Sequence, residues 1–326
     1  MMKKQSKFLA AGLIALSMIG FSCEDGASDP QGDINDPDAP KGQLSMSITD
    51  APIDGANVSG AFVTITEIKV DGQTYNGFQG PKTVNLLELQ NGNSLNLGNS
   101  EVAAGSYSKI EMVINSETDA TNSGPGCYIL KSDGTKEKLE LSGGSTTAIT
   151  MQPSDFKVTE SGQTEIIMDF DLRKAVKSNT DNSFSFVSNS ELNAAVRAEN
   201  KAMTGHIKGK IENYSSAQSD IVVFVYKKGS FNESTEVNAS GSNEVKYANA
   251  VTSAKVDAAG NFTLAFLPEG NYEIHCDKPE NNGSSGIGLN TLLDLESSVD
   301  LSNVGVNAGA ETNLALTVKL DGIINL

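Results

Sequence analysis

The sequence predicts an all-β protein with two β-sandwich domains. Short runs of alternating apolar and polar residues recur at spacings of about ten residues, and turn-forming residues separate them, as in sandwich folds. No stretch shows a long amphipathic period of 3.6 residues. The chain has 326 residues, of which 38% are hydrophobic and 31 are glycine. This length and composition suit a globular protein with two buried cores.

Strand patterns begin at Gln43. Leu44, Met46 and Ile48 alternate with polar residues until Asp50-Ala51-Pro52 ends the run. The apolar positions then change parity near Glu67, which predicts a β-bulge in a long strand. We expect further strands over 107–115, 128–131, 136–141, 148–151, 164–170 and 184–187, and helical turns over 86–89 and 169–177.

A second set of strand patterns begins after residue 200. Strands are expected over 205–211, 221–227, 250–256, 261–266, 271–276 and 314–319, with a hairpin turn over Asp257–Gly260. The predicted divisions are a signal peptide at 1–22, an acidic flexible tether at 23–41, a β-rich domain at 42–198 and a β-sandwich at 204–326.

The amino-terminal segment has the features of a secretory signal. Lys3, Lys4 and Lys7 precede an apolar run from Phe8 to Phe21, and Cys23 follows. The run is shorter than the roughly 20 residues that a helix needs to cross a bilayer. An uncleaved membrane anchor is the alternative interpretation.

Gly20-Phe21-Ser22-Cys23 resembles the lipobox of bacterial lipoproteins, which implies a lipid on Cys23. Glu24 and Asp25 resemble the acidic export signal of Bacteroidota-type lipoproteins. These resemblances imply a protein anchored in the outer membrane and exposed on the cell surface, and the periplasmic face is the alternative. The acidic, Pro- and Gly-rich stretch after Cys23 would then separate the folded part from the membrane.

Charge and cysteine content narrow the function classes. The chain has 24 basic and 41 acidic residues and a net charge of −17, which disfavours binding to nucleic acid. Loss of residues 1–22, with three lysines and no acid, changes the net charge to −20. Cys127 and Cys276 fit no zinc motif. They could form a disulfide, but two separate, partly buried thiols are the favoured interpretation.

Four short motifs carry a family resemblance in the first domain. They are Leu44–Pro52 (LSMSITDAP), Val84–Gly92 (VNLLELQNG), Ala104–Tyr107 (AGSY) and Asp169–Leu172 (DFDL). In this order they resemble the bacterial family called domain of unknown function 4382, over about residues 41–197. The resemblance implies a secreted or lipid-anchored β-rich domain and implies no activity.

The second domain has its own resemblance. Val256–Leu264 (VDAAGNFTL) and Leu267–Ile274 (LPEGNYEI) are similar to the carboxypeptidase regulatory-like, transthyretin-type β-sandwich. Phe262, Leu264 and Tyr272 are expected to face its core. Such modules usually act as spacers or interaction surfaces, so the resemblance supports a fold and not a chemistry.

Little in the sequence suggests catalysis. There are two histidines, and neither a G-x-S-x-G elbow nor an HExxH helix occurs. His206 and His275 are interpreted as ordinary strand or surface residues. Asp169 and Asp171 share one strand face and could form a carboxylate pair for glycoside cleavage. A solvated face or turn support is favoured, so we expect no enzyme.

Two kinds of binding site remain as weaker expectations. Asp50 and Asp54 could ligate calcium at a loop tip, although Asp50 acting as a turn cap is favoured. Tyr75, Phe78 and Tyr107 are the candidates for stacking against a sugar, since the chain has no tryptophan. No other cofactor is expected, and the Gly-rich stretch 283–288 is interpreted as a loop.

The sequence thus favours a non-enzymatic cell-envelope lipoprotein that acts as an adhesion or structural interaction module. Its partners would be the outer membrane, through the lipid, and an unidentified protein or glycan. The alternative is a glycan- or nutrient-binding accessory lipoprotein of an outer-membrane uptake system.

Overall fold

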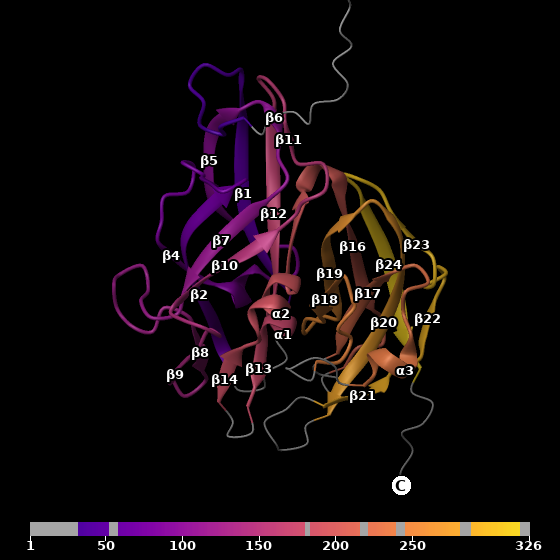
Figure 1. Ribbon diagram of the computed structural model, residues 1–326. Coiled ribbons are helices and arrows are strands. Elements are labelled where there is room, and N and C mark those ends of the chain that lie inside the picture. The colour runs from indigo at the N-terminus through magenta and orange to yellow at the C-terminus, as the bar shows by residue number, and fades with distance from the viewer. Residues whose placement is uncertain are drawn as a thin grey trace, which may run out of the picture. The chain divides into compact units, whose positions relative to one another are not determined.

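Strands predominate in the computed structural model, as the sequence predicts (Figure 1). The structure describes residues 32–51, 58–179, 183–215, 221–238, 245–280 and 288–319. These residues belong to one compact unit, which contains two β-sandwiches. The predicted all-β class is therefore confirmed.

Two sheets make up the first sandwich. Across the four-stranded sheet the order is β15 (Val196–Asn200), β12 (Gln163–Asp171), β1 (Lys41–Ala51) and β5 (Leu95–Ala103). Across the facing sheet it is β10 (Thr146–Met151), β7 (Ile110–Asn115), β2 (Val58–Val70), β8 (Tyr128–Lys131) and β9 (Lys136–Lys138), and β3 (Gln73–Thr74) and β4 (Lys82–Asn85) also pair with β2. Two small ribbons accompany them, β6 (Gly105–Ser106) with β11 (Lys157–Val158) and β13 (Val176–Ser178) with β14 (Phe184–Phe186).

The second sandwich also has two sheets. One has the order β19 (Asn261–Pro268), β16 (Thr204–Ile211), β24 (Glu311–Val318) and β22 (Leu295–Ser297). The other has the order β18 (Thr252–Lys255), β17 (Val222–Lys227), β20 (Gly270–Glu280) and β21 (Gly288–Leu292), with β23 (Val304–Val306) paired to β20.

Each sandwich encloses its own hydrophobic core. The first core draws its side chains from between Ile34 and Ala198, and the second from between Ile207 and Val318. Strand alternation explains both, because every second side chain of a strand points to the same face. Phe262, Leu264 and Tyr272 lie in the second core, as expected.

A parallel pair lies inside one sheet of each sandwich. The first strand, β1, pairs in parallel with β12, and the first strand of the second sandwich, β16, pairs in parallel with β24. The sequence did not indicate these pairings, because strand patterns alone carry no information about partners. The predicted bulge is confirmed, since the register of β2 against β7 shifts between Ile65 and Glu67.

The predicted hairpin over residues 250–266 is wrong. The turn at Asp257–Gly260 forms, with the Asp257 nitrogen donating to the Asn261 oxygen and the Gly260 nitrogen donating to the Asp257 oxygen. However, β18 pairs with β17 and β19 pairs with β16, so the turn passes from one sheet to the other. A tight turn signals a reversal of direction, and it does not decide whether the two strands bond to each other.

The folded body begins earlier than the predicted boundary at residue 42. Ile34 is 1% exposed and belongs to the first core. Its carbonyl accepts from the Ala103 nitrogen, and the Asn35 side chain donates to the Thr74 carbonyl. Residues 32–41 therefore pack on the first sandwich and are not part of a flexible tether.

Helices are short among the described residues. Three are α-helices, α1 (Leu172–Ala175), α2 (Asn189–Ala194) and α3 (Glu233–Glu236), and two are 3-10 helices, η1 (Leu86–Leu89) and η2 (Lys201–Met203). The predicted turns over 86–89 and within 169–177 are confirmed. The capping box of Ser188 and Glu191 marks the start of α2, which was not predicted. No helix of the described ranges has the length and apolar character needed to span a bilayer.

Candidate functional site

The chemically distinctive part of the described chain lies where the two sandwiches meet. There the outer face of the sheet β15-β12-β1-β5 is covered by the second sandwich, and β1 contacts β18 (Figure 1). We call this region the junction. It consists of Asp169, Asp171, Arg173, Lys174 and Arg197 of the first sandwich and the backbone carbonyl groups that they reach in the second sandwich.

Strand alternation places the two aspartates at the junction. Met168 and Phe170 of β12 are fully buried in the first core, so Asp169 and Asp171 between and beside them point to the opposite face. That face is covered, and the two aspartates are only 5% and 7% exposed. The interpretation of this pair as a solvated face is therefore wrong, whereas turn support is confirmed for Asp171, whose carboxylate caps α1 by accepting from the Lys174 nitrogen.

Arg197 connects the two sandwiches. It lies opposite Asp169 in the pairing of β15 with β12, and its Nη2 donates to Asp169 Oδ2 at 2.7 Å. Its Nη1 donates to the Phe266 carbonyl oxygen at 2.8 Å, and Nη2 also approaches the Ala265 oxygen at 3.3 Å. A planar guanidinium can hold a carboxylate and a carbonyl at once in this way.

Two basic residues of α1 make the same kind of contact. Lys174 Nζ lies 3.4 Å from Asp171 Oδ2 and donates to the Ala250 carbonyl at 2.6 Å. Arg173 donates from Nη1 and Nη2 to the Lys246 carbonyl at 3.0 and 2.7 Å. Its guanidinium also lies 4.8 Å from the centre of the Phe224 ring, which adds a cation–π contact.

These contacts share one pattern. Arg197 and Lys174 are each paired with an aspartate of β12, and each donates a charge-assisted hydrogen bond to a backbone carbonyl of the second sandwich. Arg173 makes the third such bond, from α1. Since bonds from charged donors are stronger than neutral ones and these groups are largely buried, the junction holds the two sandwiches in one orientation.

The backbone of β19 is adapted to Arg197. Phe266 has a φ of +53°, a left-handed conformation that a bulky residue rarely adopts. The register of β16 against β19 shifts between Gly205 and Ile207, beside this residue. Consecutive carbonyls of a regular strand point in opposite directions, so the irregularity allows both the Ala265 and the Phe266 oxygen to face Arg197.

Burial sets the electrostatics of the first sandwich near the junction. Asp50 is 6% exposed, accepts from the Leu172 nitrogen at 3.4 Å and leaves Oδ2 without a partner. Its pKa is raised well above the usual value, chiefly by burial and then by the charges of Asp169 and Asp171. Burial also raises the pKa of Asp169, and the charge of Arg197 opposes that shift.

The structure corrects the expected place of Asp50. The sequence suggests a loop tip or turn, whereas Asp50 is part of β1 and its carboxylate bonds to the start of α1. Asp54 lies outside the described residues, so the calcium site formed by this pair stays a prediction. Across the described ranges, no three His, Cys, Asp or Glu side chains are arranged to hold a metal ion.

The predicted sugar-stacking residues do not form an exposed platform. Tyr75 and Tyr107 are 1% and 9% exposed and belong to the first core. Their hydroxyl groups donate to the carbonyls of Leu44 at 2.5 Å and Ala103 at 2.6 Å. Phe78 is half-buried, and Lys82 Nζ lies 5.7 Å from its ring centre. The rings of both tyrosines are therefore unavailable to a sugar.

The histidines and cysteines lie on separate elements. His206 belongs to β16 and accepts from the Phe266 nitrogen, while His275 of β20 stacks on Phe231 at 3.6 Å. Cys127 and Cys276 are buried and free, one in each core. Burial raises the pKa of Cys127 to about 12 and raises that of Cys276 as well. As predicted, they are two separate thiols.

A second buried polar cluster supports the loop between β17 and β18. Tyr226 donates to Glu236 at 2.7 Å and Tyr247 donates to Asp277 at 2.5 Å. The Tyr247 ring stacks on Phe224, the ring that Arg173 contacts from the junction. This cluster therefore steadies the segment whose carbonyls Arg173 and Lys174 bind.

Sequence reasoning did not single out Arg173, Lys174 or Arg197. A signal was present, because Asp169 and Asp171 alternate with core residues, and the basic pair Arg173-Lys174 follows one residue later. Acids on the back of a buried strand need cationic partners. The lipidation and export residues Cys23, Glu24 and Asp25 lie outside the described residues, as does nearly all of the predicted loop 283–288.

Comparison with known proteins finds solved structures that are similar at about 10% sequence identity. No curated protein sequence matches the chain. Among solved structures, the Bacillus anthracis TIE protein is 11% identical with a TM-score of 0.19, and the match covers 86% of this chain and 34% of that protein. The chain thus spans about a third of that relative.

Two pilins are similarly distant. The major pilin subunit BcpA of Bacillus cereus is 10% identical with a TM-score of 0.20, and the match covers 86% of this chain and 70% of BcpA. The minor pilin GBS52 of Streptococcus agalactiae is 10% identical with a TM-score of 0.20, over 85% and 95% of the two chains. Within the first sandwich, residues 41–187 match the family model described as a domain of unknown function, DUF4382.

Proposed function

We propose that the chain is a non-enzymatic lipoprotein of the cell envelope, displayed on the outer surface, and that it works as a rigid adhesion or structural interaction module. The observation that carries this proposal is the junction. Arg173, Lys174 and Arg197 each bond to backbone carbonyls of the second sandwich. Such bonds make one stiff body from two sandwiches, which suits a protein that works by presenting surfaces.

The use of the polar groups supports a role without catalysis. Asp169 and Asp171, the sequence's candidate carboxylate pair, are engaged by Arg197 and Lys174, which also bind the second sandwich. A general acid or nucleophile needs access to a substrate, and these carboxylates are almost completely buried. Their placement supports cohesion between sandwiches.

The envelope location rests on the sequence. The apolar run that ends at Cys23, followed by Glu24 and Asp25, supports lipidation and export to the surface. Acyl chains on one residue contribute about 0.8 kcal/mol per buried CH₂, so two or more chains would anchor the body stably without a spanning helix.

Intact cells that express the full chain provide the test. Fatty-acid labelling should mark the wild type and not Cys23→Ala, and protease added to intact cells should remove the labelled wild type. Label-free wild type, or protection from protease in cells with an intact outer membrane, would contradict the location.

The mode of action is tested with the lipid-free chain on protein and glycan arrays. Saturable binding to proteins without turnover supports an interaction module. Saturable binding to glycans alone would favour the uptake-accessory alternative, and turnover of any substrate would overturn the non-enzymatic assignment.

A further inference from the structure

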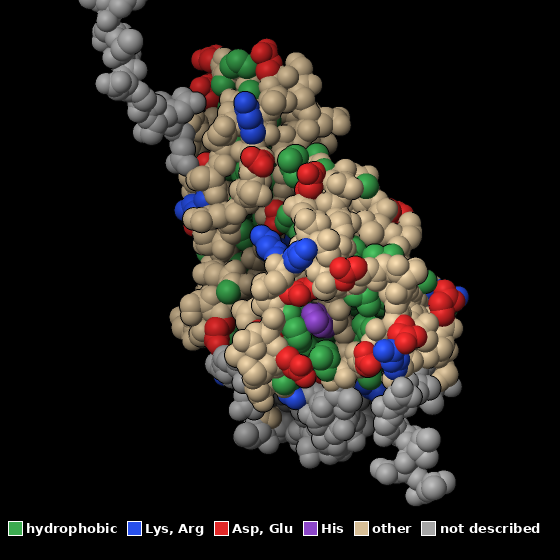
Figure 2. Space-filling model, turned by 90° about the vertical axis from the view of Figure 1, so that its right-hand side faces the viewer, with side chains coloured by type: hydrophobic (Ala, Val, Ile, Leu, Met, Phe, Trp, Pro, Cys, Tyr) green, Lys and Arg blue, Asp and Glu red, His purple; other side chains and the backbone are tan. Residues whose placement is uncertain are grey.

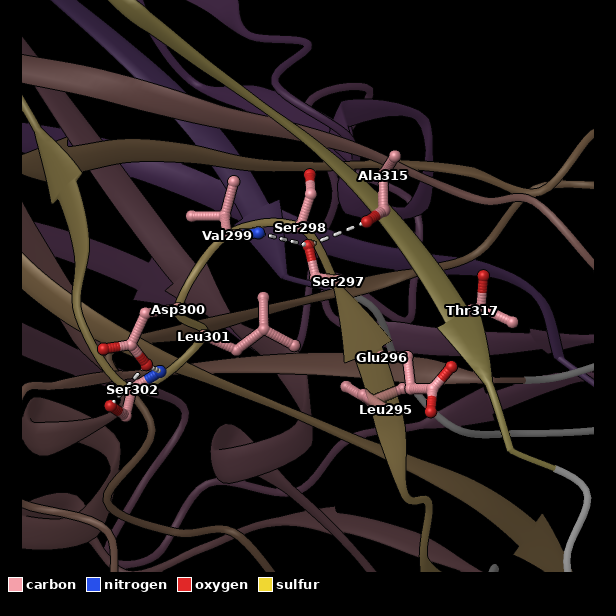
Figure 3. A pocket seen from close by; sticks show the side chains of 10 residues that line it. All are labelled: Leu295, Glu296, Ser297, Ser298, Val299, Asp300, Leu301, Ser302, Ala315 and Thr317. Atoms are coloured by element: carbon pink, nitrogen blue, oxygen red, sulfur yellow. Dashed lines mark hydrogen bonds between the residues drawn. The ribbon is translucent and has the colours of Figure 1, made fainter.

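A groove lies on the second sandwich, on the side away from the junction residues. It has a volume of about 780 Å³ and is lined by β22, the loop that follows it and two residues of β24 (Figure 3). Figure 2 shows hydrophobic and acidic side chains exposed together on this side of the molecule. Val299 in the loop is 40% exposed, one of three such large hydrophobic residues in the described chain.

The strand beside the groove has a free edge. β22 is the last strand of its sheet, and no other described strand pairs with its outer side. The Lys319 nitrogen donates to the Asp294 carbonyl, so Asp294 and, two residues on, Glu296 direct their backbone groups toward β24. By strand alternation, Leu295 and Ser297 direct their N–H and C=O groups outward.

Ser297 ends the ladder between β22 and β24 and opens the groove. Its hydroxyl donates to the Ala315 carbonyl at 2.9 Å and accepts from the Val299 nitrogen at 3.2 Å (Figure 3). The hydroxyl thus takes the place of the next backbone bond to β24. The chain can then leave the sheet at Val299 without leaving the Ala315 carbonyl unbonded.

The lining of the groove is acidic. It contains Glu296 and Asp300 and no basic residue. Asp300 accepts from the Ser302 nitrogen and hydroxyl, and these bonds, together with the smaller effect of the nearby Lys228 charge, lower its pKa, so it stays ionised. Lys319 lies 3.4 Å from both Glu296 and Asp294 and balances only one of these two charges.

From this arrangement we propose that β22 binds an extended basic peptide segment, which adds to the sheet as a further strand and lays apolar and basic side chains into the groove. The proposal deepens the interaction role proposed above. Outward backbone groups of Leu295 and Ser297 would bond to the peptide backbone. Glu296 and Asp300 favour a cationic partner, and the net charge of −17 disfavours a second copy of this acidic chain.

The test uses the purified chain and labelled synthetic peptides. The probe is a heptapeptide of alternating lysine and valine, and the comparison peptide has glutamate in place of lysine. We expect saturable binding of the lysine peptide that weakens with added salt, and no binding of the glutamate peptide. Equal binding of both peptides, or binding of neither, would overturn the proposal.

Variants locate the site. Glu296→Lys should weaken the lysine peptide roughly tenfold. Glu140→Lys should not, because Glu140 lies on the first sandwich, yet its side chain is 65% exposed against 64% for Glu296 and it likewise pairs with a lysine. An equal loss in both variants would show a general charge effect and contradict a site at β22. Ser297→Pro removes an outward N–H, and Ser297→Ala removes only the hydroxyl, so affinity should fall further in the proline variant.

A change in the probe avoids the risk that a variant misfolds. Methylation of alternate backbone nitrogens of the lysine peptide leaves its charge intact and removes donors to the β22 edge. Loss of binding in one of the two methylation registers supports strand addition, and full binding in both registers would overturn it. If the peptide does not bind although the protein is folded and displayed on the surface, the proposed function stands, because it does not depend on the edge of β22.

Discussion

The guanidinium of Arg197 donates to the carbonyl oxygen of Phe266, 2.8 Å away, and Phe266 holds a φ of +53° at that point. A left-handed phenylalanine costs on the order of 1–3 kcal/mol and persists only where the surroundings impose it. Here Arg197 binds two consecutive carbonyls, and the His206 ring meets the Phe266 ring edge-on at 5.0 Å. The strained residue is thus part of the contact between the sandwiches.

Replacing Arg197 by methionine should destabilise the protein strongly. The change leaves Asp169 buried without its cation and leaves the Phe266 carbonyl without its donor. We expect the free energy of unfolding to fall by about 2–4 kcal/mol. Equilibrium denaturation with urea measures it.

Lys201→Met is the matched control. Like Arg197, Lys201 pairs with a carboxylate of β12, here Glu165 at 2.9 Å, but the Lys201 side chain is 41% exposed. Exposed ion pairs contribute about 0–1 kcal/mol, so this variant should remain close to the wild type. Similar losses in both variants would mean that the junction owes little to burial.

The sequence predicted the strands and the cores better than it predicted the junction. The alternation of Leu44, Met46 and Ile48 predicts which face of one strand is buried, and in the structure these three side chains lie in the first core. That Asp169 would be covered by a second sandwich depends on contacts between distant segments. Alternation identifies the back of the strand as polar and does not say whether water or protein lies against it.

The prediction that Tyr75 and Tyr107 stack against a sugar is wrong for a related reason. Tyr75 and Tyr107 were candidates because the chain has no tryptophan, yet both rings are buried and each hydroxyl donates to a carbonyl oxygen. Tyrosine is compatible with both situations, since it has a large apolar body and a polar tip. Only the three-dimensional structure distinguishes a core tyrosine from a binding platform.

The turn between β18 and β19 should depend on the glycine at its end. Gly260 has a φ of +87°, and a Cβ there would lie 2.7 Å from the Ile211 oxygen. Gly260→Ala should therefore cost about 2–4 kcal/mol, from backbone conformation and from the clash. Gly134→Ala is the control, since Gly134 has the same φ and nothing within 4 Å, and it should cost only about 1–2 kcal/mol. Thermal unfolding compares the two, and equal losses would contradict the clash.

The two buried thiols should be inert in the folded protein. Cys127 and Cys276 are both completely buried, and burial raises the pKa of each thiol. Because the thiolate is the reactive form, a thiol reagent should modify neither at neutral pH until the chain unfolds. Mass spectrometry on a Cys23→Ser chain should show no adduct in buffer and two in denaturant. An adduct on the native protein would show that one core opens readily.

Asp50→Asn should stabilise the protein at neutral pH. Burial raises the pKa of Asp50 above its usual value of 3.8, so as pH rises past 3.8 the unfolded chain releases its proton first. Between pH 3.8 and the raised pKa, the free energy of unfolding of the wild type therefore falls as the pH rises. Asparagine keeps an acceptor for the Leu172 nitrogen and has no charge to bury, so its free energy of unfolding should exceed that of the wild type at pH 7.

The pH dependence of the difference in free energy of unfolding between Asp50→Asn and the wild type tests whether the buried charge of Asp50 is its cause. Below pH 3.8 Asp50 is protonated in both states, so the gain from Asp50→Asn should shrink toward zero on acidification. Asp257→Asn should show the opposite sign, because bonds from the Asn261 and Ala259 nitrogens lower the pKa of Asp257 and favour its ionised form. Urea titrations from pH 3 to pH 8 measure both variants. If the stability gain of Asp50→Asn instead grew on acidification, the folded protein would favour the ionised carboxylate of Asp50, which would contradict the prediction.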